Sequence, residues 1–136
     1  MEYSEIISAK ICPYCGNEPE LVDSSVIYGT SYGNIYLCSQ CDAYVGVHKY
    51  DGITPLGRLA DRQLREWKKA AHSHFDPIWK SAIKEGVDKS KARTEAYKWL
   101  SEVMKVNPEF AHIGMFDVEQ CKELINHCIS RKRGSQ

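Results

Sequence analysis

Four cysteines in two closely spaced pairs are the residues of this sequence that most clearly predict chemistry. Cys12 and Cys15 form one CxxC pair, Cys38 and Cys41 form the other, and 22 residues separate the pairs. A CxxC turn directs two thiolates to one point, and two such turns supply the four ligands of a tetrahedral zinc ion. Gly16 follows the first pair, where a tight turn favours a residue without a β-carbon. The spacing predicts one structural Zn²⁺, and four protein ligands leave no position for a reacting water.

The other two cysteines, Cys121 and Cys128, lie seven residues apart on one face of an expected helix. We predict that they are buried thiols and not metal ligands. The N-terminal segment MEYSEIISAKI has two acidic residues and no apolar core, so it is not a secretion signal. Reduced thiols and a cytoplasmic protein are therefore expected. No apolar run is long enough to cross a bilayer, so no membrane partner is expected.

A second group combines imidazoles with carboxylates, as acid–base catalysis or a hydrolytic metal site requires. Its members are His48, His72, Asp76, His112 and Asp117. Each also has a structural explanation, since Asp76 and Asp117 are expected to cap helices, and His72 and His74 are expected near a helix C-terminus. No P-loop, HExxH motif or nucleophile elbow is present. The sequence does not decide whether the chain is an enzyme, and it favours a role without catalysis.

Four cations, Arg58, Arg62, Arg65 and Lys69, recur at i, i+4, i+7 and i+11, with His72 at i+14. If the helix already includes Arg58, they form one stripe that can follow a phosphate backbone. The alternative is an ordinary solvated helix face.

The charge distribution indicates which part of the chain would make such a contact. Residues 1–51 hold seven acidic and two basic residues, a net charge of −5, and residues 52–136 hold eleven acidic and sixteen basic residues, a net charge of +5. Phosphates repel an acidic segment, so we expect the later residues to contact nucleic acid. Tyr28, Tyr32 and Tyr36 can stack on bases or pack across strands.

Hydrophobic periodicity indicates the elements that must position these residues. Strands are expected in ELVDSSVIY (20–28), GNIYLC (33–38) and DAYVGVHKY (42–50). Helices are expected from Asp61 to Phe75, from Pro77 to Gly86 after an Asp76 cap, over 91–106 after a Ser90 cap, and over 118–131 after an Asp117 cap that Gln120 completes. The predicted fold is α+β: a four-cysteine zinc ribbon of short antiparallel strands (1–52) packed on a bundle of three to four helices (53–136), as one compact unit.

Several longer stretches carry a resemblance to a known family. They are CPYCG, YGTSYGNIYLC, CDAYVGVHK, PLGRLAD, LREWKKAAHSHFDPIW, EAYKWL and HIGMFDVEQC. Over residues 11–128 the chain resembles the zinc-finger-containing domain family of phages, prophages and bacteria, a family without an assigned activity. The resemblance implies a zinc ribbon followed by helices, with Cys12, Cys15, Cys38 and Cys41 as ligands, in the cytoplasm of a bacterial host cell. It implies no substrate.

The leading functional hypothesis is a zinc-stabilised binding module of a phage or mobile element that contacts nucleic acid or a nucleoprotein complex. One alternative is a protein-interaction adaptor or inhibitor of a host factor. Another is a metal-dependent nuclease or hydrolase that uses His72, Asp76, His112 and Asp117. The sequence does not determine the oligomeric state.

Overall fold

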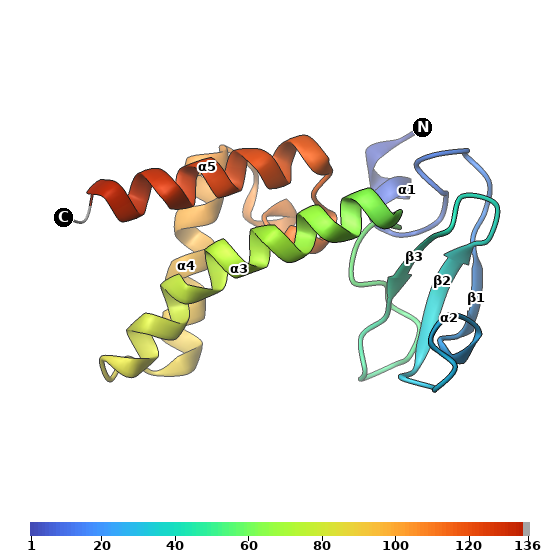
Figure 1. Cartoon of the computed structure of the whole chain (residues 1–136), viewed down its shortest axis with the longest axis horizontal. Helices are drawn as coiled ribbons and strands as arrows, with labels where there is room; N and C mark the ends of the chain where they lie inside the picture. The colour runs from blue at the N-terminus through green and yellow to red at the C-terminus, as the bar shows by residue number, and fades with distance from the viewer. Residues whose placement is uncertain (135–136) are drawn as a thin grey trace. The chain divides into compact units, whose positions relative to one another are not determined.

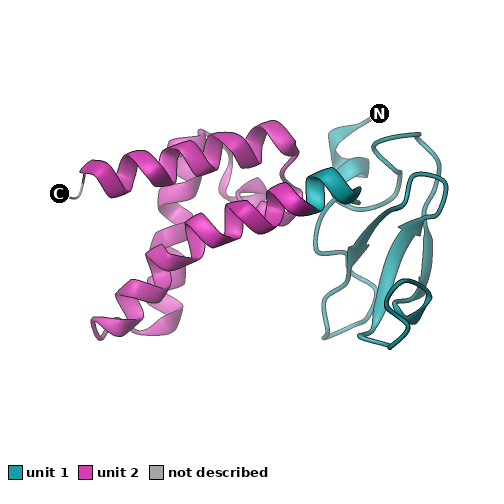
Figure 2. Ribbon diagram, in the orientation of Figure 1, with its two compact units in different colours: residues 1–65 teal, residues 66–136 magenta. Residues whose placement is uncertain are grey.

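The computed structural model describes residues 1–134 of the chain. It divides into two compact units, Met1–Arg65 and Glu66–Gln136, which Figure 2 shows in different colours. The boundary falls inside one helix, α3 (Arg62–Lys84), so the backbone passes from one unit to the other without a loop. The sequence-based boundary between residues 52 and 53, and the packing of both parts as one unit, stay predictions.

The first unit is built on a three-stranded antiparallel sheet with the order β1-β2-β3 (Figure 1). Its strands are β1 (Glu20–Asp23), β2 (Asn34–Cys38) and β3 (Ala43–Gly46), and a short helix, α1 (Tyr3–Ile7), precedes them. Cys38 is paired with Ala43 across β2 and β3. The buried core of this unit consists of Ala9, Cys12, Cys38, Ala43, Val45 and Leu59. Two of the predicted metal ligands thus lie within the core itself.

The predicted strand over residues 20–28 is correct only in its first half. The strand ends at Asp23, and Ser25–Tyr28 form a one-turn helix, α2. Local polar groups terminate the strand: the Asp23 carboxylate accepts a hydrogen bond from the Ser25 N–H at 2.8 Å, and the Ser24 hydroxyl accepts one from the Tyr32 N–H at 2.7 Å. Aspartate and serine favour such turns over a strand, and here they outweigh the β-branched residues that follow.

The predicted third strand is also shorter than expected, because β3 ends at Gly46. The chain then turns and returns along the edge of β3. His48 donates its N–H to the Thr54 carbonyl, and Tyr44 and Ala60 exchange backbone hydrogen bonds of 3.1 and 2.9 Å. This return brings Asp61, the residue that caps α3, to the edge of the sheet.

The second unit contains most of α3 together with α4 (Lys89–Met104) and α5 (Val118–Gly134), linked by the 3-10 turns η1 (Pro108–Phe110) and η2 (Ile113–Met115). Its largest fully buried side chains are Phe75, Leu100, Ile113, Phe116 and Leu124. Rings and cations join the three helices in pairs: Phe75 with Tyr97, Lys122 with Trp67, and Arg131 with Trp99. This confirms the α+β class with three main helices. No helix within residues 1–134 is long and apolar enough to cross a membrane.

The predicted helix break at Asp76 and Pro77 is wrong, because α3 continues through both residues to Lys84. Proline removes one backbone donor but has a φ compatible with a helix, and the buried Phe75 side chain anchors the helix just before it. Asp76 is therefore no cap; its carboxylate accepts a hydrogen bond from the Trp79 indole N–H at 3.2 Å. His72 and His74 consequently lie in mid-helix and not near a helix C-terminus.

The caps of the other two helices are set by aspartates. The predicted Ser90 cap of α4 is wrong: Asp88 caps the helix, and its carboxylate accepts the Lys91 N–H at 3.3 Å. The predicted capping box of α5 is confirmed, because the Gln120 N–H donates to the Asp117 carboxylate at 2.8 Å and the Asp117 N–H donates to the Gln120 side chain at 3.0 Å.

Candidate metal centre

The first cysteine pair lies on a tight turn between α1 and β1. The Gly16 N–H donates to the Cys12 carbonyl at 2.8 Å, and the Cys12 N–H donates to the Asn17 carbonyl at 2.7 Å. These bonds close the loop around the two thiols. Gly16 has a φ of +79°, a conformation that a β-carbon disfavours. This positive φ explains why a glycine follows the first cysteine pair, as the sequence predicted.

The second pair lies on the turn between β2 and β3. Cys38 is the last residue of β2, and the turn returns the chain to Ala43. Asp42 follows Cys41 with a φ of +51°, so it has the left-handed conformation that Gly16 has in the first turn. Aspartate tolerates this conformation better than most residues. Each pair is therefore followed by a residue in the left-handed conformation.

The four Sγ atoms converge to one point. All of them lie within 4.8 Å of one another, and those of Cys15 and Cys38 are 3.7 Å apart. A tetrahedron with zinc–sulfur bonds of about 2.3 Å has edges of about 3.8 Å, so the thiol spacing matches a single zinc ion. Within residues 1–134, no other group of three or more His, Cys, Asp or Glu side chains comes close enough to share a metal.

The four thiols can be deprotonated together only when a bound cation neutralises part of their charge. Burial raises the pKa of the Cys12 thiol, and the N–H groups of Tyr14 and Cys15 only partly oppose this effect. Burial also raises the pKa of Cys41, to about 12, whereas the Asn17 N–H lowers that of Cys15. Zinc binds thiolates, so binding must displace protons from this cluster. With all four ligands from cysteine, the ion would serve as a structural link and not as a catalyst.

The sequence match decides the family. Residues 8–131, nearly the whole chain, match a family described as a zinc-finger-containing domain. The chain belongs to this zinc-finger-containing domain family. No curated protein and no solved structure matches the chain significantly. Family membership and thiol geometry together identify Cys12, Cys15, Cys38 and Cys41 as one zinc site.

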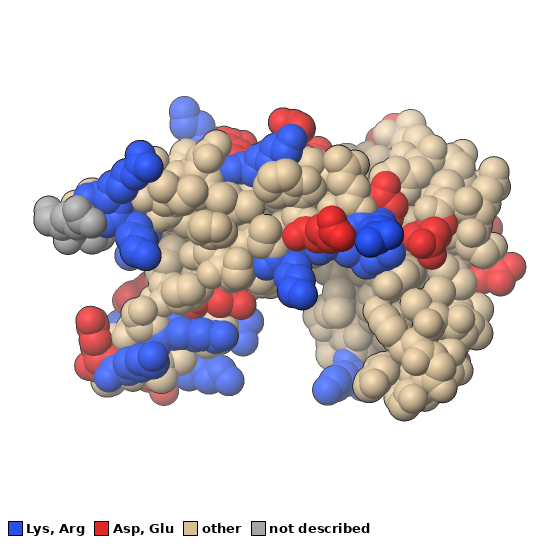
Figure 3. Space-filling view, viewed as in Figure 1, with Lys and Arg blue, Asp and Glu red and all other residues tan. Residues whose placement is uncertain are grey.

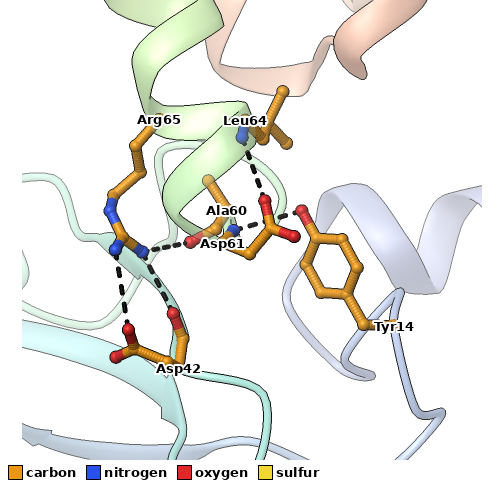
Figure 4. A network of polar contacts seen from close by, with 6 residues as sticks. All are labelled: Tyr14, Asp42, Ala60, Asp61, Leu64 and Arg65. Carbon is orange, nitrogen blue, oxygen red and sulfur yellow. Dashed lines mark hydrogen bonds and ion pairs between the residues drawn. The ribbon is translucent and has the colours of Figure 1, made fainter.

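In this zinc-finger-containing domain, both cysteine turns also hold the start of α3, as Figure 4 shows. Asp61 caps the helix, because its carboxylate accepts the Leu64 N–H at 2.9 Å. The Tyr14 hydroxyl, from the first turn, accepts the Asp61 N–H at 3.1 Å. The first cysteine turn therefore positions the capping residue.

The second turn holds α3 through Arg65. The guanidinium donates to the Asp42 carbonyl at 3.1 Å and to the Ala60 carbonyl at 2.7 Å, and it lies 3.9 Å from the Asp42 carboxylate. It also stacks 4.2 Å from the centre of the Tyr44 ring. Sequence reasoning missed Tyr14 and Asp42, although both stand next to zinc ligands.

The structure separates the four predicted phosphate contacts. Arg58 precedes α3 and is not helical, whereas Arg62 and Lys69 are exposed residues of the helix. Arg65 is bound to the second cysteine turn, so it has a structural role within the stripe. Because Arg58 is not helical, the four residues do not form one continuous stripe along the helix.

The residues of the predicted acid–base group have separate contacts in the structure of residues 1–134. His72 Nδ1 lies 3.5 Å from the Asp76 carboxylate, but Asp117 is occupied with capping α5, and His112 lies against the Tyr97 ring. No hydrogen bond or ion pair within residues 1–134 joins the His72–Asp76 pair to His112 or Asp117. His48 stacks on Tyr50 in the first unit. Cys121 and Cys128 are buried, as predicted, at 0% and 7% exposure.

Proposed function

We propose that the protein is a zinc-stabilised binding module of a phage or mobile element that contacts nucleic acid in the cytoplasm of its bacterial host. The zinc site supports this as a scaffold, because its two turns hold the start of α3. Membership in the zinc-finger-containing domain family supports the presence of a zinc site, but it does not indicate what the protein binds. The nucleic-acid contact rests on the cations of the helices.

One observation carries the proposal: the second unit has basic side chains without acidic partners. Residues 66–136 hold thirteen basic and ten acidic residues, a net charge of +3. Lys69, Lys80, Arg93 and Lys98 have no acidic side chain within ion-pair distance among residues 1–134. Figure 3 shows basic side chains, with some acidic ones beside them, near the end of α3 and the start of α4, and more basic ones at the end of α5. Unneutralised cations of this kind attract phosphates.

The predicted residues Arg58, Arg62 and Lys69 are retained as proposed phosphate contacts. Arg65 is given a different role, because its guanidinium is already bound to Asp42, Ala60 and Tyr44. Each phosphate contact releases counterions, so each should contribute about one to the salt slope of binding.

The test is the salt dependence of binding to labelled single-stranded and duplex nucleic acids of equal length. The variant Arg62→Ala with Lys69→Ala should bind more weakly, with a slope reduced by about two. The control, Lys10→Ala with Lys49→Ala, changes the net charge equally on exposed positions of the first unit and should bind as wild type. The proposal fails if the wild-type protein binds no nucleic acid at low salt.

A second candidate function is a protein-interaction adaptor or inhibitor of a host factor. Exposed apolar side chains on and beside α2 favour it: Val26, Tyr28 and Tyr32 are 62%, 52% and 75% exposed. Capture of a defined host protein in the absence of nucleic acid, lost in Val26→Asp, would favour this candidate. The hydrolase candidate has weaker support, since no hydrogen bond or ion pair within residues 1–134 joins His72 and Asp76 to His112 or Asp117.

A further inference from the structure

Arg93 on α4 lies near two aromatic rings. Its guanidinium carbon lies 5.1 Å from the centre of the Trp79 ring and 6.0 Å from that of Tyr97. Arg93 is exposed, and no acidic side chain within residues 1–134 forms an ion pair with it. Such cation–π contacts leave the N–H groups of the guanidinium available to an anion. Arg93 is therefore a cation beside aromatic rings and not one half of an ion pair within residues 1–134.

A groove of about 650 Å³ lies beside Arg93 in the second unit. It is lined by Arg93, Tyr97, Lys98, Glu102, Pro108 and His112, among others. The residues from α4 recur at helical spacing, so they lie along one face of the helix. This volume is in the range of small-molecule sites and accommodates a nucleotide.

The aromatic side chains of the groove contact neighbouring rings. The Tyr97 ring lies 5.0 Å from the ring of the fully buried Phe75 and 5.6 Å from that of His112, measured between centres. Burial lowers the pKa of His112, which favours the neutral form of its imidazole. A tyrosine that packs on Phe75, beside an imidazole, offers a surface on which a planar base can stack.

We propose that this groove binds an unpaired nucleotide of single-stranded nucleic acid, with the base against Tyr97 and His112 and the phosphates at Arg93 and Lys98. This inference rests on the proposed nucleic-acid function and names its substrate class. A paired base is already stacked within its duplex, so a ring in a groove selects unpaired bases. The Glu102 carboxylate also lines the groove and would repel a further phosphate. It can instead accept a hydrogen bond from the amino group of a base.

The tyrosines of the first unit are the competing surface for bases. Tyr28 and Tyr32 are 52% and 75% exposed, whereas Tyr97 in the groove is half-buried, and the rings of Tyr28 and Tyr32 lie 5.7 Å apart. Residues 1–65, however, hold eight acidic and five basic residues, a net charge of −3. Phosphates approach a unit of net charge +3 more readily than one of −3, so the net charge of the second unit favours the groove.

The experiment compares three ligands of equal length with the full-length zinc-loaded protein: a DNA single strand, the same strand with abasic sites throughout, and a duplex. We expect the normal strand to bind about tenfold more tightly than the abasic strand, because stacking requires bases. Tyr97→Leu should abolish this difference, and Tyr32→Leu, the matched control, should retain it. Because Tyr97 packs on Phe75, His112→Leu provides a second test, and it should reduce the difference. Arg93→Gln should lower the salt slope by about one and keep the preference for bases.

Equal binding of the normal strand, the abasic strand and the duplex would overturn the groove proposal and leave nucleic-acid binding intact. Loss of the base preference in Tyr32→Leu but not in Tyr97→Leu or His112→Leu would also overturn it and assign stacking to the first unit. If none of the three ligands binds at low salt, the proposed function itself fails.

Discussion

A single arginine shows how individual residues support the zinc site and the helix together. Arg65 donates to two backbone carbonyls, lies near the Asp42 carboxylate and stacks on Tyr44. The planar, forked guanidinium can make these contacts together, whereas an ammonium group cannot. At 27% side-chain exposure it is only partly screened by solvent. Arg65 therefore belongs to the scaffold, even though its spacing in the sequence matches a phosphate-binding stripe.

We predict that Arg65→Lys lowers the free energy of unfolding by about 1–2 kcal/mol, through loss of carbonyl hydrogen bonds to a charged donor. Arg62→Lys is the matched control, because Arg62 is exposed on the same helix and should change stability by less than about 0.5 kcal/mol. Chemical denaturation of both variants measures the difference. Equal stability of the two variants would show that the Arg65 contacts do not stabilise the fold.

The cysteines provide a matched pair for testing the ligand assignment. Cys12 and Cys121 are both 0% exposed, but only Cys12 belongs to the four-thiol cluster. Cys12→Ala should lose the metal, whereas Cys121→Ala should keep about one zinc per chain and lose about 1 kcal/mol of stability. Elemental analysis of the purified variants measures the zinc content. Full zinc retention by Cys12→Ala, or zinc loss in Cys121→Ala, would contradict the assignment.

At the scale of the elements, Pro77 within α3 is the least expected feature. Proline in a helix interior is about 3 kcal/mol less favourable than alanine, and it cannot donate to the carbonyl four residues earlier. Because α3 remains helical to Lys84, Pro77→Ala should stabilise the protein, by up to about 3 kcal/mol. Ser81→Ala, an exposed change in the same helix, is the control for denaturation experiments. A destabilised Pro77→Ala variant would indicate that the proline has a specific packing role.

The metal ligands, the order of sheet and helices and the α5 capping box could all be predicted from the sequence, because each has a signal in neighbouring residues, such as the spacing within each CxxC pair. The errors occurred where local signals competed. Asp76 and Pro77 are a typical helix start, but the rest of α3 extends through them. Residues Ser25–Tyr28 include β-branched and aromatic side chains, which favour a strand. The hydrogen bonds of Asp23 and Ser24 nevertheless turn the chain at this point. The role of Arg65 depends on Asp42 and Tyr44, which lie more than twenty residues earlier, so spacing along the helix could not indicate it.

At the scale of the whole molecule, the zero net charge conceals two units of opposite charge, −3 for residues 1–65 and +3 for residues 66–136. Four thiolates on one Zn²⁺ would add two negative charges to the first unit. The first unit thus contains the zinc site, the cap of α3 and two of the proposed phosphate contacts, Arg58 and Arg62. The second unit contains Lys69 and the groove proposed to bind an unpaired nucleotide.

We expect zinc to maintain the first unit and the start of α3, while the second unit has a core of its own. Its core residues, including Phe75, Leu100 and Leu124, do not include the zinc ligands. Metal sites of this kind form together with the fold, so zinc removal should unfold the structure around them.

Amide hydrogen exchange across the whole chain, compared between zinc-loaded and chelator-treated protein, tests this most directly. Chelation should accelerate exchange in β1, β2, β3 and the first turn of α3, where Leu64 and Arg65 bond to Asp61. Amides in the buried parts of α4 and α5 should remain protected. Unchanged exchange at the start of α3 after complete zinc removal would contradict the account, and so would loss of protection throughout both units.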